Sequence, residues 1–265
     1  MLKKIISKIL SPLIGKKFFQ SYFESLHRFS LYGMNIGGGG NPENSGEINV
    51  LNHINNHFKA KNDLIVFDVG ANVGNYSMLM KKVLGEKVTI YAFEPSIITF
   101  NMLKFNLNSL KKLELYNIGL GNENSKMTLF TDYDKSGLAS VYQRRLNHFN
   151  IDMNKYEDVE IRTLDSFCND NKIEHIHFLK LDVEGHELKV LEGAEKMICS
   201  GAIDFIQFEF GGCNIDSRTF FQDFYYFFKD NYRIFRIVKD GIYPITQYRE
   251  MYEAFLTTNF LAERK

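Results

Sequence analysis

The sequence lacks tryptophan altogether, has only three cysteines and carries no excess of charge of either sign. Lysine and arginine total 32 residues, and so do aspartate and glutamate. A balanced chain has no overall field that would attract a polyanion, so nucleic acid is not expected as a partner. No apolar stretch approaches the roughly 20 residues that a membrane-spanning helix needs.

The three cysteines, Cys168, Cys199 and Cys213, are scattered along the chain without a C-x-x-C pair. This spacing argues against a structural zinc site. An odd number of isolated thiols fits a reducing compartment better than a disulfide framework, so we expect a cytoplasmic protein.

What the chain does contain is ordinary for a globular protein, with 45% hydrophobic and 24% charged residues. The 24 phenylalanines and 14 tyrosines can form a substantial core without tryptophan. A length of 265 residues suits one large α/β domain with a short extension, or two very small domains.

The first residues combine apolar side chains at helical spacing with lysines between them. Lys8 interrupts the apolar stretch, which argues against a signal peptide, and the first acid is Glu24. One interpretation is a basic helix on an anionic membrane surface, which would place the protein peripherally at the inner face of the membrane. The alternative is an amphipathic helix that packs on its own domain or on a second subunit of a homo-oligomer.

Four consecutive glycines at residues 37–40, followed by Asn41 and Pro42, form the clearest flexible break. We therefore divide the chain into an N-terminal helical extension, residues 1–45, and a main domain, residues 46–265.

Strand and helix patterns alternate through the main domain, which predicts a doubly wound, Rossmann-like, mostly parallel sheet of seven strands. The expected strands are residues 64–69, 87–93, 113–118, 176–181, 203–208, 233–238 and 258–262. The expected helices are residues 49–59, 76–84, 97–109, 187–200 and 219–230. A β-rich insertion at about residues 121–163, with strands at 126–131 and 159–163, interrupts the rhythm and is expected to carry part of the substrate site.

The segment after the first expected strand, residues 68–74, reads DVGANVG and points to a ligand site at the carboxyl ends of the strands. A dinucleotide fingerprint would need glycine at positions 72 and 75, and both are asparagine, so an NAD-dependent oxidoreductase is the less favoured alternative. Gly70 allows a sharp turn, and Gly74 removes a side chain where a ligand would lie against the backbone. The expected cofactor contacts here are Asp68, Gly70, Asn72, Gly74, Asn75 and Tyr76.

Glu94 ends the second expected strand, 24 residues after Gly70. An acid at this place can accept hydrogen bonds from both hydroxyls of a ribose. Pro95 and Asn117, at the end of the third expected strand, complete the expected cofactor contacts.

Residues 68–74 together with Phe93-Glu94-Pro95 resemble class I S-adenosylmethionine-dependent methyltransferases. Residues 180–187 (KLDVEGHE), 190–194 (VLEGA), 45–47 (SGE) and 163–165 (TLD) are similar to the FkbM family within that class. The resemblance implies S-adenosyl-L-methionine as the cofactor. It also implies O-methylation of sugars or polyketide-linked groups. His186 departs from the small residue expected there in many relatives.

Two carboxylates, Asp182 and Glu184, follow the fourth expected strand beside the cofactor crevice. Three roles stay open: Asp182 binding the amino group of the cofactor's methionine, either carboxylate acting as general base, or both holding a Mg²⁺ ion. No third metal ligand is evident from spacing, so no metal ligands are assigned. His186 is a further candidate base.

Three residues are expected to contact the acceptor. Glu209 ends the fifth expected strand and faces the same edge of the sheet, while Tyr142 and Arg144 belong to the insertion. The sequence therefore favours an S-adenosylmethionine-dependent O-methyltransferase acting on a small-molecule or glycan acceptor. A non-catalytic module bound to a membrane surface is the remaining alternative.

Overall fold

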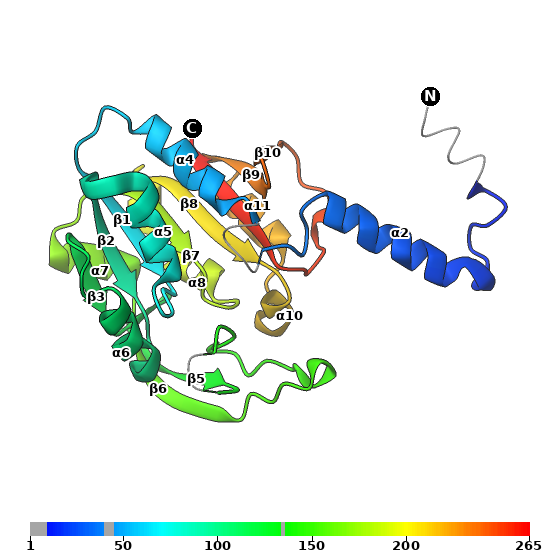
Figure 1. Cartoon of the computed structure of the whole chain (residues 1–265), viewed down its shortest axis with the longest axis horizontal. Helices are drawn as coiled ribbons and strands as arrows, with labels where there is room; N and C mark the ends of the chain where they lie inside the picture. Colours follow the sequence, from blue (N-terminus) through cyan, green and yellow to red (C-terminus); the bar gives the residue numbers. More distant parts are fainter. Residues whose placement is uncertain (1–9, 40–44, 134–135) are drawn as a thin grey trace.

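A computed structural model describes residues 10–39, 45–133 and 136–265 of the chain. Figure 1 shows a central twisted sheet flanked by helices, a small second sheet beneath it, and one helix, α2 (Gln20–Gly33), that stands away from the body. The helix expected from Leu2 onward lies mostly outside the described residues, as do three of the break's residues, Gly40, Asn41 and Pro42.

The main sheet has eight strands in the order β10-β9-β11-β8-β7-β1-β2-β3. They are β1 (Leu64–Val69), β2 (Val88–Phe93), β3 (Leu113–Tyr116), β7 (Ile176–Leu181), β8 (Ile203–Phe210), β9 (Tyr232–Val238), β10 (Gly241–Ile245) and β11 (Thr258–Arg264). The five strands from β3 to β8 run parallel, and β11, β9 and β10 pair antiparallel. The mostly parallel α/β sheet is confirmed.

The expected number of seven strands was wrong, because β10 forms an eighth strand at the edge. It follows β9 through a tight turn, and its residue Pro244 disguised the strand pattern. Proline cannot donate to a neighbouring strand and is tolerated at sheet edges, which is where β10 lies.

The central strands are buried on both faces, which explains their continuous apolar runs. Phe67, Leu179 and Ile206 are register partners on one face and belong to one core cluster. Val66 and its partners Phe178 and Phe205 lie on the other face, in a second cluster. Successive side chains thus enter two separate cores, as the period of two in a strand requires.

Most of the expected helices are confirmed to within a few residues. They are α4 (Glu47–His57), α5 (Asn75–Leu84), α6 (Ile97–Asn106) and α11 (Phe221–Phe228). The sequence patterns missed α2, α10 (Cys213–Ser217) and α7 (Leu164–Asn171), the last of which is capped by the Thr163 hydroxyl accepting from the Ser166 amide.

The single helix expected at residues 187–200 was wrong, since two short helices occupy this stretch. They are α8 (Glu187–Glu192) and α9 (Glu195–Cys199), separated at Gly193 and Ala194. A Cβ atom at Gly193 would lie 1.9 Å from the carbonyl oxygen of Gly121, so the backbone turn rests directly on the insertion.

The two strands expected in the insertion are present, and they form a three-stranded sheet with β4, a short strand that was not predicted, in the order β4-β6-β5. It consists of β4 (Gly119–Leu120), β5 (Ser125–Thr131) and β6 (Lys155–Arg162). The strand expected at residues 159–163 is β6, which starts four residues earlier and ends one residue earlier. Its early start was missed because exposed charged residues there hide the alternation of apolar and polar side chains.

The segment after α2 is anchored on the main sheet. The side-chain amide of Asn35 donates to the carbonyl oxygens of Ser45 and Ile237, at 2.8 and 3.1 Å. The amides of Gly37 and Gly39 both donate to the carbonyl oxygen of Thr257. Among the described residues, no helix is long and apolar enough to cross a membrane.

Candidate active site

A sharp turn after β1 brings two strand ends together. The amides of Gly70 and Ala71 donate to the carbonyl oxygen of Phe93 at the end of β2. Gly70 has φ +80°, and a Cβ atom there would lie 1.8 Å from the carbonyl oxygen of Asp182 at the end of β7. The predicted turn at Gly70 is confirmed, and the close approach of β7 is a second reason for glycine.

Glu94 lies at the end of β2 and is only 7% exposed. Its carboxylate accepts hydrogen bonds from the amides of Asn72 (3.0 Å) and Ser96 (2.9 Å). Burial raises the pKa of Glu94 to about 7, against the effect of these two donors. Asn117 donates to the carbonyl oxygens of Glu94 and Pro95, so it holds the loop and does not line the cavity beside it.

Two residues of the DVGANVG segment have packing roles instead of the ligand contacts expected of them. Asp68 is fully buried, accepts a hydrogen bond from the Ser77 hydroxyl at 2.6 Å and lines neither cavity of the site. At Gly74, a Cβ atom would come within 2.9 Å of Leu103 and Leu107. The missing side chain of Gly74 therefore admits α6, and Gly74 lines neither cavity.

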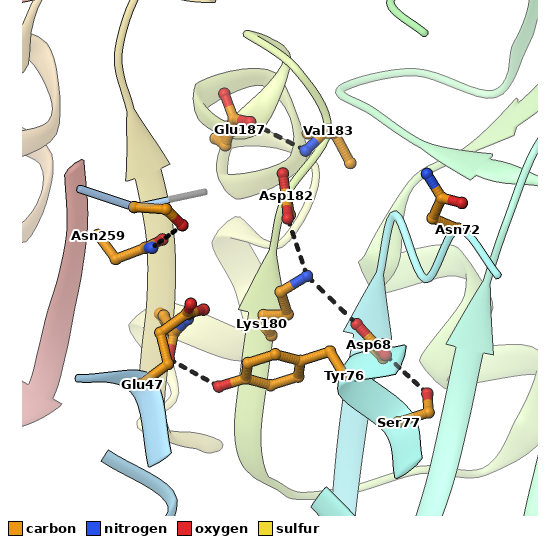
Figure 2. A network of polar contacts seen from close by, with 12 residues as sticks. Glu47, Asp68, Asn72, Tyr76, Ser77, Lys180, Asp182, Val183, Glu187 and Asn259 are labelled. Carbon is orange, nitrogen blue, oxygen red and sulfur yellow. Dashed lines mark hydrogen bonds and ion pairs between the residues drawn. The ribbon is translucent and has the colours of Figure 1, made fainter. Parts of the chain in front are cut away.

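A buried lysine, Lys180 of β7, joins Asp68, Asp182 and Tyr76 into one network of polar contacts (Figure 2). Its ammonium lies 3.0 Å from the Asp182 carboxylate, 3.6 Å from that of Asp68 and 4.7 Å from the ring centre of Tyr76. Burial opposes its charge, but Asp182, Asp68 and Glu47 raise the pKa of Lys180 above its ordinary value.

The network continues from Tyr76 to the first helix of the main domain. The Tyr76 hydroxyl donates to Gln207, whose amide donates in turn to Glu47 at 2.7 Å. Sequence reasoning missed Lys180, Gln207 and Glu47 as site residues. The available signal was a lysine and a glutamine inside mostly apolar strands.

Replacing Lys180 with methionine is expected to lower the free energy of unfolding by about 3–5 kcal/mol, because it leaves the buried Asp68 carboxylate without its cation. Urea unfolding of Lys180→Met and of the wild type at pH 7 measures this loss. Lys189→Met serves as the control, since Lys189 is half-exposed on α8. A loss below about 1 kcal/mol would show that Asp68 does not depend on Lys180.

Two adjoining cavities open at the carboxyl ends of the parallel strands. The first is lined mainly by apolar side chains beside Glu94, among them Pro95, Leu120, Leu129 and Ile161. The second has a volume of about 420 Å³, and its lining includes Asn75, Tyr76, Lys180 and Glu209. Five residues line both cavities, so the two adjoin: Gly70, Asn72, Gly137, Asp182 and Glu184.

The predicted pair Asp182 and Glu184 therefore stands at the junction of the cavities. Asp182 is held by Lys180, while Glu184 lies 2.5 Å from the Arg144 guanidinium of the insertion. Burial, followed by the charge of Asp182, raises the pKa of Glu184 to about 8 despite Arg144.

Glu209, at the end of β8, is 9% exposed, lines the second cavity and has no hydrogen bond or ion pair within the part of the chain that the structure describes. Burial, then the charges of Asp182 and Glu184, raises its pKa well above the ordinary value. One ligand atom each of Glu184, Glu209 and Cys213 lies within 4.8 Å of the others. Burial also raises the pKa of the Cys213 thiol.

His186 lies on the other side of the junction. It lines the first cavity and not the second, and its Nδ1 atom is 3.0 Å from the Tyr142 hydroxyl. Burial lowers the pKa of His186 to about 4, so the ring is neutral. Tyr142 lines neither cavity and positions His186, whereas Arg144 does line the second one.

The strand order, the glycine turn after β1 and the acid at the end of β2 define a class I methyltransferase fold. The chain belongs to the FkbM methyltransferase domain family, whose model matches residues 68–234. This membership confirms the resemblance noted in the sequence and makes the oxidoreductase alternative wrong.

Three curated relatives carry methyltransferase names. Methyltransferase 1 of Beauveria bassiana is 28% identical over 148 residues, which cover 50% of this chain and 59% of that protein. The 2-O-methyltransferase NoeI of Sinorhizobium fredii is 22% identical over 147 residues, covering 52% and 60%. The hexuronic acid methyltransferase AglP of Haloferax volcanii is 25% identical over 138 residues, covering 51% and 52%. The chain thus matches between half and three-fifths of the length of these relatives.

Proposed function

We propose that this protein transfers the methyl group of S-adenosylmethionine to a hydroxyl oxygen of a sugar or a related small molecule. The observation that carries the proposal is the pair of adjoining cavities with two carboxylates, Asp182 and Glu184, at their junction. The names of NoeI and AglP, a 2-O-methyltransferase and a hexuronic acid methyltransferase, support an acceptor of this kind.

The first cavity suits a nucleoside. It combines an apolar slot with one buried carboxylate, Glu94, whose remaining lone pairs can accept hydrogen bonds from two ribose hydroxyls. The second cavity has room for an amino acid tail and an acceptor. There, the carboxylate of Asp182 can accept hydrogen bonds from an ammonium group, and Asn72, Asn75 and Tyr76 line the wall.

S-adenosylmethionine supplies an electrophilic methyl group on a positively charged sulfur. The protein has to align the acceptor oxygen and remove its proton. We assign proton removal to Glu184, because it stands at the junction and has a pKa near neutrality, where a general base is most effective. Arg144 holds the Glu184 carboxylate in place, and Glu209 is free to receive further acceptor hydroxyls.

The proposal is tested by mixing the protein with S-adenosylmethionine carrying a labelled methyl group and a panel of free sugars, uronic acids and glycosides. Transfer of label to an acceptor oxygen, located by mass spectrometry, supports the assignment. Transfer to nitrogen or carbon acceptors alone contradicts the oxygen assignment, and the absence of S-adenosylhomocysteine binding in calorimetry contradicts the cofactor assignment.

Cofactor affinity is expected to fall as pH falls below about 7. A ribose hydroxyl needs the deprotonated Glu94 carboxylate, and below its pKa each pH unit reduces that form, so the Kd for S-adenosylhomocysteine should rise by up to about tenfold per unit. Above about pH 7 the Kd should level off. Calorimetry between about pH 5.5 and 8 measures the Kd over a range that extends about one unit or more on each side of the pKa.

The Glu94→Gln variant is the control for this dependence. It should bind the cofactor more weakly at pH 8 and lose the pH dependence, whereas Glu160→Gln, at an exposed position of β6, should keep it. A pH dependence that persists unchanged in Glu94→Gln would assign the titration to another buried acid, such as Glu187, whose pKa burial also raises to about 7.

A further inference from the structure

Helix α2 carries an apolar face that nothing in the described chain covers. Its only buried residue is Leu31, near its end. Tyr22, Leu26 and Phe29 recur at intervals of four and three residues, which places them on one side of α2. Phe18 lies four residues before Tyr22, in the short 3-10 helix Lys17–Phe19 that leads into α2. Phe18 is 86% exposed and Phe29 is 72% exposed, an unusual state for large aromatic side chains.

The same segment is basic, although the chain as a whole is neutral. Within residues 10–33, Lys16, Lys17 and Arg28 are opposed by the single acid Glu24. Residues 1–33 contain six basic residues and one acid, whereas residues 34–265 contain 26 basic and 31 acidic ones. The positive charge is thus concentrated on the extension, and the catalytic body is net negative.

The end of α2 is tied to the rim of the second cavity. Gly39, which follows the anchored turn after the helix, lines that cavity together with Thr257 and Asn259. Gly39 is bonded to both of them, through its amide to Thr257 and through its carbonyl oxygen to Asn259. The segment that follows α2 therefore joins the helix to the rim of the proposed acceptor site.

We propose that α2 and residues 10–19 before it dock on an anionic lipid bilayer, with the aromatic face in the headgroup region and Lys16 and Lys17 on the lipid phosphates. A helix with aromatic residues on one face and lysine or arginine beside it has the composition of interfacial helices. Apolar burial and charge attraction act together in this arrangement.

The charge distribution favours a bilayer over a second copy of the chain as the occupant. Two α2 helices that paired through their aromatic faces would bring two clusters of positive charge together. An anionic bilayer instead attracts the extension and repels the net negative body, which leaves the catalytic face free. This inference does not depend on the identity of the acceptor or on catalysis.

The experiment is vesicle flotation of the full-length protein with phosphatidylcholine vesicles that contain about 30 mol% phosphatidylglycerol, beside vesicles of phosphatidylcholine alone. We expect binding to the anionic vesicles only, weakened by salt. The Lys16→Gln/Lys17→Gln variant should bind about 30-fold more weakly, since each basic residue near such a surface contributes about fivefold. The Phe18→Ser/Tyr22→Ser/Phe29→Ser variant should bind at least about tenfold more weakly.

Two matched controls keep the test specific. Phe105→Ser on α6 and Tyr156→Ser on β6 remove side chains that are 76% and 74% exposed on the body, and they should bind vesicles like the wild type. All variants should keep the wild-type unfolding temperature. Equal flotation of the aromatic variant and the wild type overturns the proposal. So does sedimentation showing a dimer that this variant dissociates, without vesicle binding, because α2 would then pair with a second copy.

Discussion

Replacing Glu184 with glutamine is expected to lower kcat by about 10²–10⁴-fold, the usual contribution of a positioned general base. Glutamine keeps the size of the side chain and a carbonyl oxygen for Arg144, but it cannot take a proton. The acceptor hydroxyl would then keep its proton while it attacks, which makes it a poor nucleophile. Initial rates with labelled S-adenosylmethionine measure the loss.

The pH profile separates this role from a purely structural one. Because burial and Asp182 raise the pKa of Glu184 to about 8, the rate of the wild type should rise with pH and level off above that value. This rise of the rate with pH should be absent in Glu184→Gln, whereas the Kd of that variant for S-adenosylhomocysteine should stay close to the wild-type value. Glu192→Gln, on the half-exposed end of α8, is the control. A kcat within threefold of the wild type, together with a large loss in Asp182→Asn, would transfer the role of base to Asp182.

The sequence predicted the central sheet well because each parallel strand is buried on both faces and therefore reads as an uninterrupted apolar run. β1 and β7 were predicted with their observed bounds. β10 escaped because an edge strand is only half-buried and tolerates Pro244. The break between α8 and α9 escaped because it arises from contact with Gly121, far away in the sequence.

The candidate site was predictable to the extent that it follows strand ends. Residues at the ends of β1, β2, β7 and β8 meet at one edge in any parallel sheet, and the structure does bring Gly70, Glu94, Asp182 and Glu209 there. Pairings between elements were not predictable. The ion pair of Arg144 with Glu184 joins residues 40 positions apart through the insertion.

The DVGANVG segment shows why a motif does not assign roles to its residues. Asp68 and Gly74 belong to the same pattern as Gly70 and Asn72, yet Asp68 anchors Ser77 and Lys180, and Gly74 admits α6. A short sequence pattern shows which residue types a position requires, but it does not show whether ligand contact or packing is the reason. The three-dimensional environment alone separates these two needs.

The insertion was expected to serve the acceptor, and the structure gives it two positions. Leu129 of β5 and Ile161 of β6 line the first cavity, beside Glu94. Arg144, in the loop between these strands, reaches the second. The small sheet thus closes the nucleoside side of the proposed site and also places a guanidinium at the acceptor side, which links the two halves physically.

The turn at Gly70 is the point where any side chain is expected to do the greatest damage to the fold. Gly70→Ala would place a Cβ atom 1.8 Å from the carbonyl oxygen of Asp182, and neither backbone can move freely, since β1 and β7 are paired in the buried centre of the sheet. We expect a loss of at least about 4 kcal/mol in the free energy of unfolding, which belongs to the rare and severe class of single substitutions.

Gly85 provides a control, because it also has a positive φ angle but lacks the close neighbour. Its φ is +75°, and a Cβ atom there would meet nothing within 4 Å. Gly85→Ala should therefore cost only the strain of its own backbone conformation, φ +75° with ψ −156°, about 1–3 kcal/mol. Urea unfolding of both variants isolates the clash from the strain. Equal losses in the two variants would mean that β7 can withdraw from the turn, and Asp182 would then not be fixed at the junction of the cavities.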